Sequence, residues 1–106
     1  MKALAHWPPL HDGVIDSIVI EWPGPICRVL LGTSDYERLA IVGMDTRLVT
    51  CPQSRPWGHS HDLYVNEARL TNTNEGLARL EIETQEGDLI VIEAAEISIG
   101  VNDGEK

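Results

Sequence analysis

Two histidines and an aspartate lie close together in His59-Ser60-His61-Asp62. In an extended backbone, residues two apart project to the same side, so His59 and His61 could bind one metal ion. Asp62 could add a carboxylate oxygen to that site. His11 could supply a further ligand if the start of the chain folds over this loop. The spacing therefore points first to a metal site.

A simpler interpretation competes with the metal site, because histidines in a loop are more often solvated polar residues. The spacing is similar to the start of an H-x-H-x-D-H zinc-hydrolase motif, but Asp62 comes one place too early and no histidine follows it. A chain of 106 residues is also too short for that hydrolase fold. We therefore expect no cofactor, and keep a small metal-binding module or metal-dependent hydrolase as the alternative.

Cysteine chemistry is the second candidate. Cys51 with His59 could form a nucleophile and base pair, and Cys51 could also form a disulfide with Cys27. In a reducing compartment, however, both cysteines are more simply small buried residues. We expect buried thiols.

Carboxylates on one face of a predicted hairpin are the third candidate. Glu81, Glu83 and Glu93 could contain a general acid and base, but Arg79 lies among them in a stretch of alternating polarity. This pattern favours a solvated surface on an exposed face. No complete catalytic set remains, so we expect that the protein is not an enzyme.

The loop over residues 51–62 is the longest segment without strand periodicity, and Trp57 lies in it between Pro56 and Gly58. Trp57 could anchor a partner, because tryptophan dominates interface hot spots. It could instead plug the core, which we favour because the chain contains no phenylalanine. We expect six residues to bind a partner or organise the loop: Arg55, Pro56, Trp57, Gly58, Ser60 and Asn66.

Short β-branched segments separated by Gly, Pro and Asn indicate the fold that must hold these residues. The pattern predicts a single all-β domain over residues 1–106, with six to seven mostly antiparallel strands in a sandwich or partly open barrel. We expect little or no helix, because a helix-capping pattern at Ser34-x-x-Glu37 is followed by β-branched residues. A loose lead-in is expected over residues 1–13 and a frayed tail over 102–106.

Local signals predict several details of the strands. Gln85-Glu86-Gly87 suits a three-residue hairpin loop that pairs Ile82 with Ile90. After Ile92 the apolar residues change from even to odd positions, which predicts a bulge or bend near residues 94–96. Gly43 is a plausible bulge site in a strand over residues 38–50. The even positions of the first long strand share an apolar face that Asp16 interrupts: Val14, Ile18, Ile20 and Trp22.

Charge limits the partners. The chain carries 17 acidic and 8 basic residues, a net charge of −9, with nine acidic and two basic residues after position 74. This field repels phosphate backbones and favours a basic protein partner. We see no signal peptide and no run of about 20 apolar residues. We therefore expect a cytoplasmic protein that binds neither nucleic acid nor membranes, and homo-oligomers through sheet edges are an open possibility.

Short motifs connect the chain with a family. The opening Leu10-His11-Asp12, the segment Pro56-Trp57-Gly58-x-Ser60 and the downstream Asn66 resemble small bacterial β-rich proteins of unknown function. Some of these are similar to immunity proteins encoded beside polymorphic toxins. The resemblance implies the fold class and no catalytic residue. Together with the acidic charge, it leads us to expect a soluble bacterial protein that is a non-enzymatic protein–protein interaction module of an immunity-like kind.

Overall fold

The computed structural model describes residues 2–52 and 63–102, and within these ranges the chain forms strands and no helix. The all-β prediction is confirmed, and the described residues contain no helix that could cross a membrane. The strands are β1 (Lys2–Ala3), β2 (Val14–Glu21), β3 (Ile26–Gly32), β4 (Leu39–Thr50), β5 (Leu63–Asn72), β6 (Ala78–Thr84) and β7 (Leu89–Val101).

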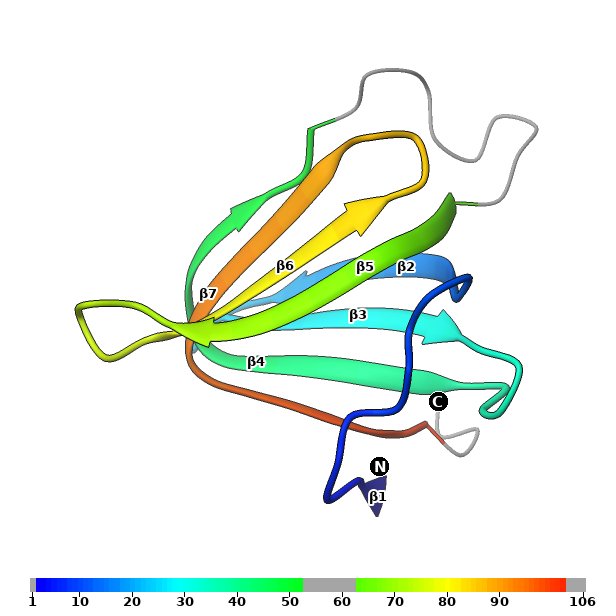
Figure 1. Ribbon diagram of the computed structural model, residues 1–106. Helices are drawn as coiled ribbons and strands as arrows, with labels where there is room; N and C mark the ends of the chain where they lie inside the picture. Colours follow the sequence, from blue (N-terminus) through cyan, green and yellow to red (C-terminus); the bar gives the residue numbers. More distant parts are fainter. Residues whose placement is uncertain (1, 53–62, 103–106) are drawn as a thin grey trace.

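All strands belong to one antiparallel sheet in the order β1-β7-β4-β3-β2-β5-β6, and β6 pairs again with β7. The pairing therefore runs round in a ring, which Figure 1 shows with β5, β6 and the start of β7 in front of β2, β3 and β4. The contact of β2 with β5 involves only Val14 opposite Tyr64 and Ile15 opposite Leu63. The fold is thus a single ring-like sheet, neither a closed barrel nor a sandwich of two separate sheets.

The two longest strands, β4 with 12 residues and β7 with 13, bend and pass from one layer to the other (Figure 1). Gly43 lies where these strands come close, because a Cβ added there would stand 3.3 Å from the Cβ of Ala94. The register of β4 against β7 shifts between Thr46 and Leu48. The predicted bulge is therefore present in this strand, but it follows Gly43 rather than including it.

The predicted change of phase in β7 is confirmed. Ala95 and Glu96 are both exposed, which interrupts the alternation of buried and exposed residues. Before them the even positions Ile90, Ile92 and Ala94 are buried, and after them the odd position Ile99 is buried. The buried side chains of β7 thus change from even to odd positions at the bend, so this one strand contributes apolar residues to both layers of the sheet.

The hairpin between β6 and β7 has the predicted register, with Ile82 opposite Ile90 and Leu80 opposite Ile92. The N–H of Thr84 donates to the carbonyl of Asp88 at 2.8 Å. Gly87 has a φ of 97°, a conformation that glycine adopts without steric cost. Local turn chemistry was therefore sufficient to define this part of the sheet.

The predicted apolar face of β2 is only partly correct. The register of β2 against β3 shifts between Ile15 and Ser17, so the odd position Ile15 is buried and Asp16 is exposed. Beyond the shift Ile18 packs against the core. Ile20 and Trp22 were predicted on the buried face, but they are 41% and 75% exposed. Among the described residues, β5 pairs only with the beginning of β2, at Val14 and Ile15.

The lead-in is held more firmly than the predicted loose segment. β1 pairs with β7, and the N–H of Leu4 donates to the carbonyl of Ile99 at 3.0 Å. Leu10 is 6% exposed and Trp7 packs against the buried cluster. At the other end of the chain, the N–H of Asn102 donates to the carbonyl of Arg38. The lead-in covers part of the core that the ring of strands leaves open.

Replacing Trp7 by Ala should therefore lower the free energy of unfolding by about 2 kcal/mol, because a partly buried indole and its packing contacts are lost. Urea denaturation measures this effect. Trp22→Ala is the matched control, and it should change the free energy by less than about 0.5 kcal/mol because Trp22 is 75% exposed. Equal effects of the two substitutions would contradict this account of the lead-in.

Candidate functional site

Most of the residues that the sequence singled out lie outside the described part of the chain. They are Arg55, Pro56, Trp57, Gly58, His59, Ser60, His61 and Asp62. The metal site and the two roles considered for Trp57 therefore remain predictions. Two predicted residues, His11 and Asn66, are described.

The structure brings His11 and Asn66 together across the chain. The Nδ1 atom of the His11 ring lies 2.7 Å from the backbone carbonyl oxygen of Asn66, to which it can donate a hydrogen bond. Asn66 is the extra residue where the register of β5 against β6 shifts, between Val65 and Glu67. A bulge leaves a backbone carbonyl without a partner in the hydrogen-bond ladder of the sheet, and His11 bonds to this carbonyl of Asn66.

Neighbouring contacts extend this junction to the β6–β7 hairpin. The side-chain amide of Gln85 donates to Asp12 Oδ1 at 2.6 Å and to the carbonyl of Val65 at 3.3 Å. The N–H of Asp12 donates to Val65, and the N–H of Val65 donates to Gly13, each at 2.8 Å. These contacts tie the lead-in, the start of β5 and the hairpin loop together. His11 thus has a structural contact here, and no three potential metal ligands cluster among the described residues.

The two cysteines occupy different environments. Cys27 on β3 is 1% exposed, as predicted, whereas Cys51 just after β4 is exposed and the prediction of a buried thiol is wrong there. Both are free thiols. Burial, followed by repulsion from Cys51, raises the pKa of Cys27, and partial burial, followed by repulsion from Asp88, raises the pKa of Cys51. Raised pKa values keep both groups protonated, which does not suit a nucleophile.

We expect iodoacetamide to alkylate Cys51 in the folded protein more slowly than a free cysteine at about pH 8, because only the thiolate reacts. The rate should rise at higher pH, and Cys27 should react only after unfolding. Mass spectrometry of alkylated peptides measures both rates, with Cys51→Ser as the control that abolishes alkylation of the native protein. Rapid alkylation of Cys27 in the folded state would contradict the structure.

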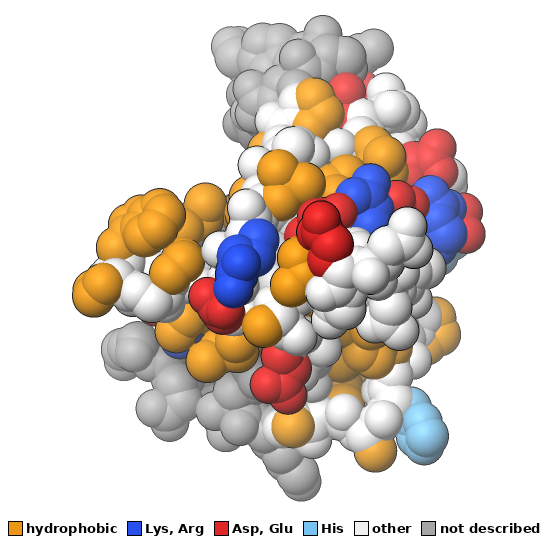
Figure 2. Space-filling model, turned by 90° about the vertical axis from the view of Figure 1, so that its left-hand side faces the viewer, with side chains coloured by type: hydrophobic (Ala, Val, Ile, Leu, Met, Phe, Trp, Pro, Cys, Tyr) orange, Lys and Arg blue, Asp and Glu red, His pale blue; other side chains and the backbone are white. Residues whose placement is uncertain are grey.

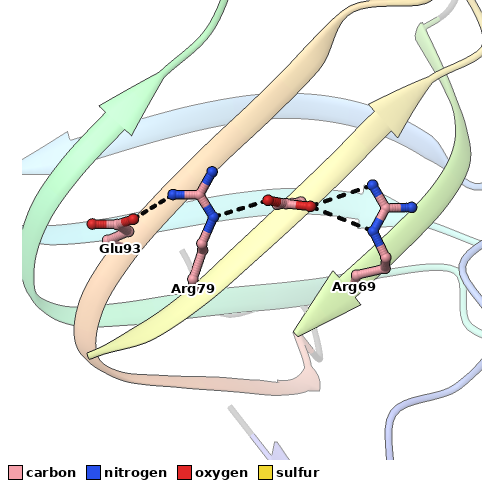
Figure 3. A network of polar contacts seen from close by, with 4 residues as sticks. Arg69, Arg79 and Glu93 are labelled. Atoms are coloured by element: carbon pink, nitrogen blue, oxygen red, sulfur yellow. Dashed lines mark hydrogen bonds and ion pairs between the residues drawn. The ribbon is translucent and has the colours of Figure 1, made fainter. Parts of the chain in front are cut away.

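Alternating charges cross the outer face of three strands (Figure 3). Arg69 on β5 donates to Glu81 on β6 at 3.3 Å, and Arg79 on β6 donates to Glu81 at 2.9 Å. Arg79 also bonds to Glu93 on β7. The hydrogen bond from Arg79 is the largest effect that lowers the pKa of Glu81. Glu81 and Glu93 are therefore bonded to arginines on the outer face of the sheet, and their side chains are 23% and 19% exposed.

Glu81 should stabilise the fold in a pH-dependent way, because a carboxyl with a lowered folded pKa stabilises the fold above its unfolded pKa and loses this contribution as pH falls through the folded pKa. Glu81→Gln should therefore lower the denaturation midpoint at about pH 7 and have little effect at about pH 2. Glu83→Gln is the matched control, since Glu83 lies on the same strand and forms no ion pair with a described residue. A pH-independent difference would exclude this linkage.

A further surface lies at the end of β2, and the sequence did not identify it. Val19, Ile20 and Trp22, which we call the β2 edge patch, are 39%, 41% and 75% exposed. Figure 2 shows a group of hydrophobic side chains at the left of its view, with a basic and an acidic side chain beside it. Glu21 lies within the patch and is ion-paired with Arg28 on β3.

Two sequence signals could have revealed this patch. Pro23-Gly24-Pro25 follows Trp22 directly, so Trp22 lies beyond the last paired residue of β2, Glu21. Asp16 breaks the apolar alternation and marks the point beyond which no described strand pairs with one side of β2. A tryptophan between a strand end and a proline turn is thus poorly placed for burial.

No protein-family model matches the sequence, and comparisons with curated proteins and with solved structures give no match either.

Proposed function

We propose that this chain is a non-enzymatic protein–protein interaction module of a bacterial, immunity-like kind, and that it binds a basic protein partner through the β2 edge patch. The observation that supports this proposal most directly is Trp22, which is 75% exposed beside the exposed Val19 and Ile20. Large exposed apolar side chains in a group are a common feature of protein interaction sites.

The chemistry of the patch suits a binding hot spot. Tryptophan contributes a large apolar area with few rotatable bonds, so ordering it on binding costs little entropy. The turn after it is constrained by two prolines, and the N–H of Thr46 donates to the carbonyl of Pro25 at 2.9 Å. Trp22 is thus attached to a turn that β4 supports, which limits the reorganisation that binding requires.

The charge of the chain supports a basic partner. A net charge of −9 attracts cationic surfaces over about a Debye length and raises their rate of association. Asp16 is exposed before the β2 edge patch, and Glu21, which is ion-paired with Arg28, is exposed within it. They could orient lysine or arginine side chains of the partner around the apolar centre.

The state of the reactive groups supports a non-enzymatic role. The pKa values of both thiols are raised, which opposes the formation of a nucleophilic thiolate. Hydrogen bonds from arginines, first of all from Arg79, lower the pKa of Glu81, which opposes a role of Glu81 as a proton donor.

Trp22→Ala should weaken partner binding by about 30-fold or more, the loss typical of a hot-spot residue, while leaving the fold intact. The first partners to test are the purified products of the two genes that flank the gene of this protein, measured by isothermal titration. Leu70→Ala on β5 is the matched control, since Leu70 is 44% exposed and lies outside the patch. Equal binding by all three proteins, or no binding at all, would refute this site.

A further inference from the structure

We propose that the partner docks as an extended basic segment, which adds a β-strand to the edge of β2 over residues 17–21, where no described strand pairs. This inference rests on the proposed function and specifies how the β2 edge patch is occupied. It assigns the recognition to backbone hydrogen bonds with β2, combined with alternating apolar and basic side chains on the added strand.

The first support is the pairing of β2. On one side β3 accompanies β2 throughout, from Gly32 opposite Val14 to Ile26 opposite Glu21. On the other side β5 pairs only with Val14 and Ile15. Within residues 2–52 and 63–102, no strand pairs with that side of residues 17–21. The N–H and C=O groups that point to this side can therefore accept a partner strand of about five residues.

The second support is the composition of this edge. Natural proteins protect open strand edges with lysine, proline or inward-pointing charges. Residues 17–21 read Ser-Ile-Val-Ile-Glu and contain neither lysine nor proline. The bulge at Asp16 precedes the segment and does not interrupt it. The edge is thus suited to pairing rather than protected against it.

The third support is the placement of side chains on the two faces. Val19 lies opposite Arg28, and Ile20 lies opposite the buried Cys27, so these neighbours face opposite sides of the sheet. Both are about 40% exposed. An added strand would cover both with its own alternate side chains, which removes apolar area from water on each face.

The fourth support is charge. Asp16 precedes the edge and Glu21 ends it, and the exposed indole of Trp22 follows directly. A lysine or arginine on the added strand can approach Asp16 at one end and stack on the indole at the other. A second copy of this chain would instead bring a charge of −9 against −9. Charge complementarity therefore favours a basic segment over self-association.

The test is a selection from a display library of random twelve-residue peptides on the immobilised full chain. We expect enriched peptides that alternate apolar residues with lysine or arginine. The best peptide is then synthesised and titrated against Ile20→Lys, which places a charge on the edge, and Leu70→Lys, its control at a similarly exposed position on β5. Binding should fall at least tenfold for the first variant and by less than twofold for the second.

Two further measurements address the binding mode. The backbone nitrogens of the peptide are methylated either at its odd or at its even positions. One of these two patterns should abolish binding, because it removes the N–H groups that donate to β2. The peptide should also slow hydrogen exchange at amides of residues 17–21 that exchange rapidly in the free protein. Should Ile20→Lys fail to fold, Val19→Lys on the other face replaces it, with the same expected loss.

Several results would overturn this inference. They are an absence of enriched peptides, binding that survives both methylation patterns or Ile20→Lys, and slow exchange of all edge amides in the free protein. Self-association that Ile20→Lys abolishes, seen by sedimentation without peptide binding, would identify a second copy as the occupant instead. If Trp22→Ala weakens a natural partner while Ile20→Lys and Val19→Lys do not, strand addition fails and the proposed function stands. If none of these three substitutions weakens binding of the natural partner, both strand addition and the proposed function fail.

Discussion

The close approach of β4 and β7 at Gly43 and Ala94 is the constraint on which the rest of the structure depends. These strands pair from Leu39 opposite Val101 to Thr50 opposite Val91, and both change direction along this ladder. A side chain at position 43 would press on Ala94, because only 3.3 Å is available for its Cβ. The small residues allow the strands to bend together, so a single sheet can surround its own core.

Bending by two long strands also determines where the ring is incomplete. The layers are joined by the extended β4–β7 ladder on one side, but on the other side β2 and β5 share only two residue pairs. The lead-in compensates near this junction through Leu10, Trp7 and the hydrogen bonds between Asp12, Val65 and Gln85. The far end of β2 receives no such cover from the described residues, and the β2 edge patch is the consequence.

The distribution of charge complements this arrangement. On the outer face of β5, β6 and β7, acidic groups are neutralised in pairs, with Arg69 and Arg79 holding Glu81 and Glu93. Such pairs contribute little stability individually, but they keep this face charged and solvated. The β2 edge patch presents apolar groups instead, with Asp16 before it and Glu21 within it. The two surfaces thus differ in polarity.

The sequence by itself determined the features that depend on neighbouring residues. Alternating polarity and turn residues predicted the all-β class, and Gln85-Glu86-Gly87 with the apolar parity of the flanking strands predicted the β6–β7 register. The phase change near Ala95 was also visible, because side-chain parity is a local property. Arg79 among alternating glutamates likewise indicated that these carboxylates lie on an outer face of the sheet.

Only the tertiary structure decided which strand edges and which tryptophan are covered. Periodicity placed Ile20 and Trp22 on an apolar face, but burial requires a second layer above that face, and among the described residues β5 pairs with β2 only at Val14 and Ile15. For the same reason the lead-in was predicted to be loose, although Trp7 packs against the core and Leu10 is buried within it. The contact between His11 and Asn66 spans 55 positions. Contacts of this kind depend on how the sheet closes, which no local pattern of residues records.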